Sequence, residues 1–337
     1  IILLRNKIKL NSMEDTMLMS YVLDAGRHRH NMDNLSEIHL NHKPISFKEV
    51  TGTGKNQISF DEVPIKLATQ YAAEDADVTF RLYNLFKERL DKEKLLKIYE
   101  LFEKPLINLL AQMEIEGIKI DSNFLNELSK KFDVKIKKLE KEIFKEAKKE
   151  FNIGSPKQLG EILFIDMGIK GGKKTKTGTY STDSGILEDL AHHGYDIAKL
   201  VLEWRELTKL RSTYTEALLD QTEDKTNRVH TSYAIATTIT GRLSSNDPNL
   251  QNIPIRTENG KKIRNAFIAE SNNKLVSFDY SQIELRLAAE ISQDKNFIEA
   301  FLKGEDIHTS TAKEIFNLKD KELSSEYRRK AKAINFG

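Results

Sequence analysis

The 337-residue sequence contains no cysteine, six prolines and a single tryptophan. The absence of cysteine excludes disulfide bonds and thiolate-ligated zinc, and it is typical of a protein of the reducing cytoplasm. No segment approaches the ~20 uninterrupted apolar residues of a membrane-spanning helix, so we expect no membrane partner. The opening Ile1-Ile2-Leu3-Leu4 has neither an initiator methionine nor the features of a signal peptide, which indicates the interior of a longer protein.

Charge of one sign is not in excess either, since 53 Lys and Arg against 51 Asp and Glu give a net charge of +2. With 39% hydrophobic and 31% charged residues, the chain has the composition of a globular protein of two or three domains. Local charge is uneven: residues 129–150 hold nine Lys and five acids, and residues 167–182 hold four Lys and no acid. These segments indicate contact with a polyanion, although a solvated helix face followed by a flexible loop explains them equally well.

Apolar spacing predicts long helices in the first two thirds of the chain. Residues 68–90 have a helical pattern, and the lysine-rich residues 91–97 are a candidate hinge. Asp121 can cap an amphipathic helix with 3-4-4-3-4 apolar spacing. Its seam consists of Leu125, Leu128, Phe132, Ile136, Leu139 and Ile143. Further along, residues 229–235 and 275–279 have the pattern of strands.

The run 279–286, Asp-Tyr-Ser-Gln-Ile-Glu-Leu-Arg, begins at the end of the second predicted strand. Metal ligands are often carboxylates at the carboxyl end of a core strand, and phosphoryl transfer needs such a group to hold Mg²⁺. The helix that follows would project Gln282 and Glu284 around Asp279. Taken alone, the run is explained better if Asp279 merely caps that helix.

Residues 240–254, Thr-Gly-Arg-Leu-Ser-Ser-Asn-Asp-Pro-Asn-Leu-Gln-Asn-Ile-Pro, combine one arginine with many amides and hydroxyls. Donors of this kind suit phosphate oxygens and minor-groove acceptors, which carry little sequence information. An ordinary turn cluster would account for the glycine and the prolines but not for Arg242. We therefore expect this loop to bind DNA, through Arg242, Asn249, Gln251 and Asn252.

Arg328, Lys332 and Phe336 are spaced four and four, so they project from one face of a helix predicted at 324–336. Two cations followed by an aromatic ring match the phosphates and the base or sugar of a nucleotide. A basic surface helix is the alternative, but it would leave Phe336 exposed without reason. His308 could donate to the same phosphates, although a lone histidine is more often an ordinary surface or core residue.

Three runs resemble successive polymerase motifs of the bacterial-type family A DNA polymerases, in the order of that family: residues 240–254, 279–286 and 328–337. The resemblance extends over the whole chain and implies an α/β multidomain protein with the right-hand architecture of a polymerase. The parts that it implies, in chain order, are the end of a ribonuclease H-like 3′–5′ exonuclease domain (1–92), a mainly helical thumb (93–225), part of the palm (226–290) and the start of the fingers (291–337).

The resemblance implies template-directed DNA synthesis from deoxynucleoside triphosphates, with two Mg²⁺ ions per active site in the complete enzyme. Asp279 would bind both catalytic metals together with the main-chain carbonyl of Tyr280. Glu284 would crowd a ribose 2′-OH, and Lys332 would be a general acid for the pyrophosphate leaving group. The other residues implied to contact the incoming nucleotide are Tyr280, Gln282, His308, Arg328 and Phe336.

The thumb and the loop 240–254 are implied to hold the primer–template duplex. Arg242 would contact the minor-groove edge at the primer terminus, with Gln282 nearby. The thumb residues implied to grip the duplex backbone, together with the loop 170–182, are Ser155, Lys157, Lys209 and Arg211.

The amino-terminal part resembles the exonuclease domain of the same family. Residues 14–18 resemble its second carboxylate motif and residues 71–75 its third. This implies Asp15, Tyr71 and Asp75 as exonuclease residues, with the two aspartates as metal ligands. Tyr71 and Asp75 are one helical turn apart, so phenol and carboxylate can share a metal-bound water.

Two motifs of the family are absent from the sequence. Nothing before Asp15 supplies the Asp-x-Glu pair that begins the exonuclease, and no His-Asp-Glu run supplies the second metal-binding aspartate of the polymerase. A two-metal site with half its ligands binds Mg²⁺ poorly. We therefore expect negligible polymerase and exonuclease activity from this polypeptide alone.

Three competing interpretations are a DNA-binding fragment that holds primer–template without catalysis, a phage- or organelle-type family A replicase, and an exonuclease with a vestigial polymerase half. We expect a monomer associated with the cytoplasmic nucleoid.

Two further patterns carry little weight. Residues 51–55 are similar to a P-loop, but Asn56 stands where Ser or Thr is required. The following histidines lack the cysteines or the spacing of a standard zinc site: His28, His30, His39 and His42.

Overall fold

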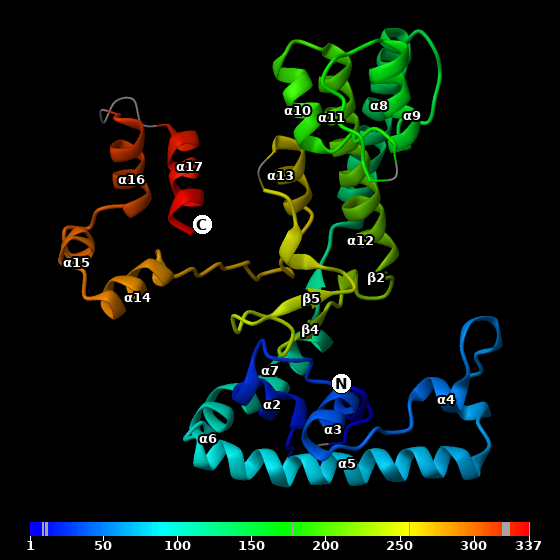
Figure 1. Cartoon of the computed structure of the whole chain (residues 1–337), viewed down its shortest axis with the longest axis vertical. Coiled ribbons are helices and arrows are strands. Elements are labelled where there is room, and N and C mark those ends of the chain that lie inside the picture. Colours follow the sequence, from blue (N-terminus) through cyan, green and yellow to red (C-terminus); the bar gives the residue numbers. More distant parts are fainter. Residues whose placement is uncertain (9, 11–12, 177, 256, 319–323, 337) are drawn as a thin grey trace. The chain divides into compact units, whose positions relative to one another are not determined.

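The computed structural model describes residues 1–8, 10, 13–176, 178–255, 257–318 and 324–336 (Figure 1). The chain divides into two compact units, Ile1–Asn273 and Lys274–Gly337. Helices make up most of both units, and every strand of the described residues is short and lies in the first unit. Within the described part of the chain, no helix is long and apolar enough to cross a membrane.

The described residues of 1–92 form helices and no strand. The longest helix, α5 (Ile65–Lys92), confirms the helix predicted at 68–90 and packs against α2 and α3 (Figure 1). It buries one residue on each of four successive turns: Val78, Leu82, Phe86 and Leu90. The elements before it are α1 (Ile2–Arg5), α2 (Thr16–Asp24), α3 (Met32–Leu40), α4 (Phe47–Thr51), η1 (Gly54–Asn56) and η2 (Phe60–Glu62).

A short helical run leads from α5 to the first strands: α6 (Leu96–Ile98), the π-helical turn η3 (Tyr99–Glu103) and α7 (Lys104–Glu116). Gly117 ends α7, as a helix stop should, with a φ of +63°. A Cβ at this position would lie 2.7 Å from the main-chain oxygen of Val229, so no larger residue fits without a shift.

Two small antiparallel sheets follow from this turn. The first has the order β1 (Ile118–Lys119), β3 (Arg228–Val229) and β2 (Thr222–Glu223). In the second, β4 (Ser232–Ala234) pairs with β5 (Ser244–Asn246). The strand predicted at 229–235 is therefore confirmed only in part, because it is divided between the two sheets at Thr231.

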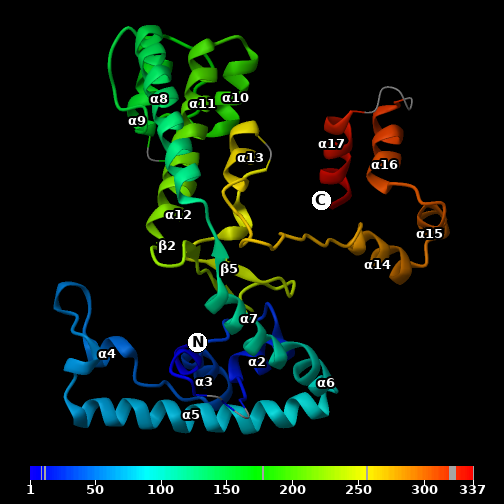
Figure 2. The same cartoon turned by 180° about the vertical axis from the view of Figure 1, so that it is seen from behind.

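The helical column of the first unit is organised by α8 (Ser122–Ala147), which lies beside α11 (Figure 2). Asp121 caps α8 through the Phe124 N–H, as predicted, and all six seam residues are buried. The remaining elements are α9 (Pro156–Glu161), η4 (Ile162–Asp166), α10 (Ser184–His192), α11 (Asp196–Lys209), η5 (Leu210–Glu216), α12 (Ala217–Asp220), η6 (Leu250–Asn252) and α13 (Glu258–Arg264).

The second unit consists of α14 (Ile283–Ser292), α15 (Lys295–Leu302), α16 (Ile307–Phe316) and α17 (Ser325–Phe336), with α16 packed on α17. The helix predicted at 324–336 is confirmed. The strand predicted at 275–279 is wrong: this segment is extended, but no described segment pairs with it, and Phe278 is 94% exposed. A strand needs a neighbour for its N–H and C=O groups, which apolar alternation alone cannot supply.

Candidate functional site

The loop 240–254 is held in shape by a buried pair of hydroxyls. The Oγ atoms of Thr231 and Ser245 lie 2.7 Å apart, and Thr231 Oγ1 lies 2.8 Å from the carbonyl oxygen of Pro248. The Leu250 N–H donates to Ser245 Oγ at 3.1 Å. Thr231 comes from the segment between β3 and β4, so the pair ties the loop to the sheets. Nothing in the spacing of the sequence indicated this role for Thr231.

The four predicted DNA-binding residues of the loop are exposed on both sides of β5: Arg242 precedes this strand, and the other three follow it. Gln251 donates through Nε2 to the Leu243 carbonyl at 2.9 Å, and Asn249 Oδ1 accepts from the Gln251 N–H. The Asn252 carbonyl accepts from the Tyr214 hydroxyl at 2.6 Å. The loop is therefore anchored by contacts to its main chain and to the buried Ser245, while many of its side chains are exposed. Its exposed residues include Arg242, Asn249, Gln251 and Asn252.

The thumb residues predicted from the sequence lie on α9, α11 and η5. Ser155 caps α9 by accepting from the Gln158 N–H, and Lys157 is exposed beside it. Lys209 lines a hollow of about 660 Å³ together with Pro156 and residues 179–183. The structure therefore brings Lys209, the start of α9 and the end of the loop 170–182 (the lysine-rich loop) together.

Arg211 is placed differently from the other predicted thumb cations. Its guanidinium lies 2.8 Å from Asp133 and 2.9 Å from Glu216. A phosphate would have to compete with these two carboxylates for the same donors. Arg211 therefore has a structural role in joining η5 to α8, whatever it does toward DNA.

Sequence reasoning missed Arg205, which fastens the lysine-rich loop to α11. Its NH1 donates to the Thr182 carbonyl, and its NH2 lies 3.1 Å from Thr182 Oγ1. Burial lowers the pKa of the Arg205 guanidinium, although Asp183 opposes that effect. An arginine in a mixed helix pattern gives no signal of such a contact across 23 residues.

Replacing Arg205 by glutamine is expected to release this loop. Hydrogen bonds from a charged donor contribute about 1.5–3 kcal/mol each, and Arg205→Gln removes the bonds from Arg205 to Thr182 that hold the loop. We expect faster proteolysis within residues 170–182 and a severalfold weaker affinity for duplex DNA in fluorescence anisotropy. Lys199→Gln, on the exposed side of the same helix, is the matched control. Unchanged proteolysis and DNA affinity in Arg205→Gln would refute the role.

Asp279 and Tyr280 lie in the extended segment before α14, and both side chains are exposed. No hydrogen bond or ion pair joins the Asp279 carboxylate to any described residue. Nor does Asp279 cap the helix, because the N-cap position of α14 is Gln282, which makes no side-chain cap bond. Glu284 is exposed in the first turn of α14. The cap interpretation therefore fails, and the carboxylate is available to a ligand.

The predicted triphosphate residues gather on α16 and α17. Arg328 lies on α17, and its NH2 donates to Asp306 Oδ2 at 2.5 Å. His308 is 3% exposed, and its Nδ1 lies 2.9 Å from Asn335 Nδ2. Burial lowers the pKa of His308, with Arg328 and Lys332 acting in the same direction and Asp306 against it.

Lys332 is one turn along α17 from Arg328 and is exposed. The side chain of Phe336 lies outside the described residues. Two predicted residues thus lie on one pair of packed helices: His308 on α16 and Arg328 on α17. No hydrogen bond or ion pair among the described residues connects them with Asp279.

The predicted exonuclease residues are only partly brought together. Tyr71 and Asp75 lie one turn apart on α5, and Asp75 lines a hollow of about 520 Å³ with Glu14 and Thr16. Asp15 lines a different hollow, and its Oδ1 caps α2 by accepting from the Met17 and Leu18 N–H groups. Glu14, which was not predicted as a site residue, therefore shares the hollow with Asp75.

The carboxylate of Asp75 is partly buried on α5. Its Oδ1 is buried without a hydrogen-bond partner. Burial raises the pKa of Asp75, although a hydrogen bond from Tyr71 opposes this. Tyr71 in turn is held edge-on by Phe47 and Phe60 at centroid distances of 6.2 and 5.7 Å. A buried, unpaired carboxylate oxygen is costly unless a cation or donor reaches it.

Tyr99 positions the start of α2 and was not predicted. It is fully buried; its hydroxyl donates to Glu14 Oε2 at 2.8 Å and accepts from the Asp15 N–H at 3.0 Å. Tyr99→Phe leaves the partly buried Asp15 N–H and the Glu14 carboxylate without this partner, so we expect the free energy of unfolding to fall by about 1–3 kcal/mol. Urea denaturation measures it. Tyr83→Phe, which loses only an exposed bond from Lys87, should change it by less than about 0.5 kcal/mol; equal losses would contradict this account.

Comparison with known families identifies the class of protein to which this chain belongs. The family model described as DNA polymerase family A matches residues 122–337, and the one described as 3′-5′ exonuclease matches residues 1–91. The polymerase match covers more than half of the chain. The chain belongs to DNA polymerase family A.

Its curated relatives carry the name DNA polymerase I. The one from Rhizobium leguminosarum is 52% identical over 337 residues, which are 100% of this chain and 33% of the relative. The one from Pseudomonas aeruginosa is 45% identical over 324 residues, 96% of this chain and 36% of the relative. The chain thus spans about a third of the length of these relatives. Their bacterial origin confirms the bacterial type of the resemblance.

A solved structure supports the same fold. It is described as the POL domain of Pol1 from M. smegmatis in complex with DNA primer-template and dNTP. The match has a TM-score of 0.83 and 32% sequence identity, and it covers 99% of this chain and 55% of that chain. The fold is therefore that of an exonuclease part followed by a family A polymerase part, as predicted.

Proposed function

We propose that the protein containing this chain is a DNA-directed DNA polymerase with an associated 3′–5′ exonuclease, acting in DNA replication and repair. It extends a primer 3′-OH by deoxynucleotidyl transfer along a template, as a cytoplasmic, nucleoid-associated monomer. The observation that carries the proposal is the match over 99% of the chain to a polymerase domain described with primer-template and dNTP. The boundaries proposed for its parts are 1–92 for the exonuclease, 93–225 for the thumb, 226–290 for the palm and 291–337 for the fingers.

Asp279 is the proposed catalytic carboxylate. It fits Mg²⁺ because it is exposed and unpaired, and because hard oxygen ligands such as a carboxylate and the Tyr280 carbonyl are those that Mg²⁺ takes. When bound there, Mg²⁺ would neutralise charge on the transferred phosphate and activate the attacking 3′-oxygen. Glu284, at the start of α14, would select against a ribose 2′-OH, with Gln282 beside it.

Arg328, His308 and Lys332 are proposed to bind the triphosphate, with Phe336 on the base or sugar. Arg328 donates to Asp306, so an incoming phosphate would replace a carboxylate as its partner. Lys332 is exposed on the same helix and would give a proton to the pyrophosphate as it leaves. These residues order a nucleotide by charge and hydrogen bonding rather than by reading its base.

Arg242, Asn249, Gln251 and Asn252 are proposed to contact the duplex near the primer terminus. Ser155, Lys157, Lys209 and Arg211 would contact its backbone. Tyr71 and Asp75 are proposed for the exonuclease, and the buried unpaired oxygen of Asp75 fits a metal cation. Asp15 would have only one oxygen left for a metal, since the other caps α2. Glu14 is the neighbouring carboxylate on the hollow of Asp75.

A DNA-binding role without catalysis is the alternative for this polypeptide by itself. Fluorescence anisotropy with a primer–template duplex, measured beside a primer-extension assay on the same preparation, distinguishes the two activities. We expect salt-dependent binding of the duplex, because Lys and Arg would displace counterions from phosphates, and negligible extension. Robust extension by the 337 residues alone would refute the expectation of inactivity. Failure to bind the duplex would overturn the proposed DNA contacts.

A further inference from the structure

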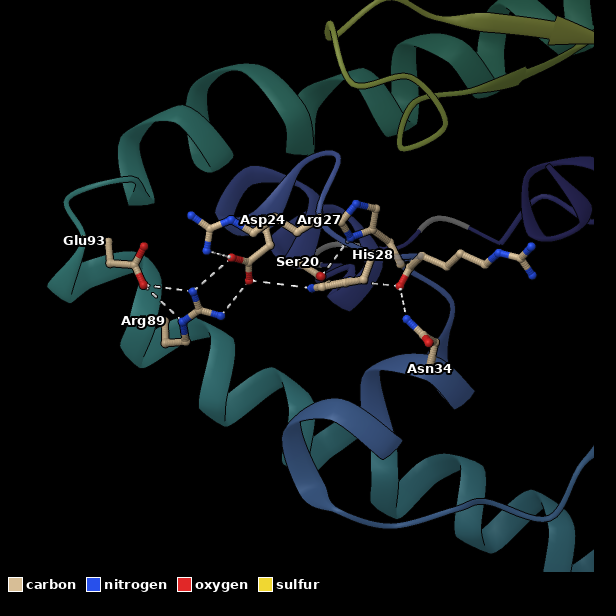
Figure 3. A network of polar contacts seen from close by, with 9 residues as sticks. Ser20, Asp24, Arg27, His28, Asn34, Arg89 and Glu93 are labelled. Carbon is tan, nitrogen blue, oxygen red and sulfur yellow. Dashed lines mark hydrogen bonds and ion pairs between the residues drawn. The ribbon is translucent and has the colours of Figure 1, made fainter.

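A partly buried polar cluster lies where the end of α2, the loop after it and the end of α3 meet; Figure 3 shows two of its members, Asp24 and His28. One ligand atom each from Asp24, His28 and His39 lies within 4.8 Å of the others. Asp24 is 5% exposed and the His28 side chain 15%. The ring of His39 meets Phe86 of α5 edge-on, with 5.1 Å between centroids. None of these residues belongs to the polymerase or exonuclease sites proposed above.

The hydrogen bonds of His28 fix its tautomer. Nδ1 lies 3.0 Å from the main-chain oxygen of Arg29, which also accepts from Asn34 at 2.8 Å (Figure 3). A carbonyl can only accept, so Nδ1 of His28 carries a proton and donates it. In the neutral ring, Nε2 then presents a bare lone pair. A backbone carbonyl on one ring nitrogen is also the usual outer partner of a histidine that binds metal through the other.

The lone pair of His28 Nε2 is buried without a hydrogen-bond partner and faces Asp24 Oδ2 at 3.8 Å. Nε2 of His39 is likewise buried and has no hydrogen-bond partner. A bare, buried imidazole nitrogen that faces a carboxylate is unfavourable unless a positively charged species lies between them, and a second unpartnered nitrogen close by adds to that cost.

We propose that Asp24, His28 and His39 bind one divalent transition-metal cation of the zinc class. Two imidazole nitrogens and one carboxylate oxygen are an established three-ligand set for zinc, with water as the fourth ligand. Mg²⁺ is a poor occupant because it prefers oxygen ligands. The cation would join the end of α2 to the end of α3. Its site is separate from the magnesium site proposed at Asp279.

Two arginines oppose a cation at this position. Arg27 lies 3.1 Å from Asp24 Oδ1 and Arg89 lies 2.8 Å from Oδ2, while Glu93 partly neutralises Arg89 at 3.0 Å (Figure 3). A carboxylate has about four lone-pair sites, so both arginines and a metal can surround it. Their charge weakens metal binding. Because Arg27 is 75% exposed, Arg27→Gln is a mild change to the fold. It should tighten zinc binding by about threefold, since it removes one partly screened like charge.

The test is equilibrium dialysis of the untagged 337-residue chain against ZnCl₂, with metal analysis of the protein. We expect one zinc per chain, a higher Tm with zinc than after chelation, and a visible absorption band of tetrahedral coordination when Co²⁺ replaces zinc. His28→Gln and His39→Gln should each weaken zinc binding by about tenfold or more. His192→Gln, an exposed histidine at the end of α10, is the matched control and should bind zinc like the unmodified chain.

Circular dichroism of the metal-free proteins checks that each variant folds. If a variant does not fold, zinc binding by the unmodified chain still tests the proposal. Absence of stoichiometric zinc, or a Co²⁺ spectrum of octahedral coordination, overturns the proposal. So does zinc affinity that is retained in both His28→Gln and His39→Gln, or lost equally in His192→Gln. A weaker affinity in Arg27→Gln would also contradict it.

Discussion

Asp279→Asn is expected to lower the rate of primer extension by the full-length gene product about a thousandfold, because a metal ligand at a transferring phosphate contributes several kcal/mol to the transition state. Asparagine keeps the size of the side chain and loses its charge. Since Asp279 is exposed and makes no hydrogen bond or ion pair with another described residue, the fold should be unchanged. The single-turnover rate with saturating primer–template and deoxynucleotide measures the effect.

The matched control is Glu290→Gln, an exposed acid on α14. It should extend primers like the unmodified protein. Asp279→Asn should also need more Mg²⁺ for half-maximal rate, whereas a change in DNA affinity is not expected. A rate within tenfold of the unmodified protein would remove Asp279 from the catalytic site.

Lys332→Met is expected to lower the same rate about a hundredfold or more, in keeping with the contribution of a general acid. Methionine keeps the length of the side chain and cannot donate a proton. Lys330→Met is the control on the same helix, since Lys330 is two residues away on another face and pairs with Glu326 at 2.9 Å. If Lys332 only attracts the triphosphate, the KM for deoxynucleotide rises and kcat is retained. That split would contradict its role as an acid.

The parts of the fold that the sequence predicted best are those in which periodicity reports burial directly. The seam of α8 and the four buried turns of α5 are examples, because each apolar residue faces the neighbouring helices. The helix end at Gly117 could be predicted equally well, since a helix stop is a local feature of the sequence. Segment 275–279 failed for the opposite reason. Its alternation is that of a strand, but pairing depends on a partner that no local pattern specifies.

Several site contacts that escaped prediction join residues far apart in the sequence. Arg328 was predicted to share a helix face with Lys332, but its partner Asp306 is 22 residues away and could not be inferred. Arg205 and Thr182 show the same limitation. The histidines whose spacing in the sequence does not fit a standard zinc site lie in different places in the structure. His28 and His39 lie beside Asp24, whereas His42 pairs with Glu74 at 2.8 Å. Both α2 and α3 pack on α5, which brings His28 and His39 to the same place.

The central claim is that this chain belongs to a polymerase that copies a template. Single-nucleotide incorporation by the full-length gene product tests it most directly, with each of the four deoxynucleotides offered separately opposite each template base. The account predicts Mg²⁺-dependent addition to the primer 3′ end of the complementary deoxynucleotide alone. Addition that ignores the template base, or no addition by a folded protein that binds the duplex, would contradict it.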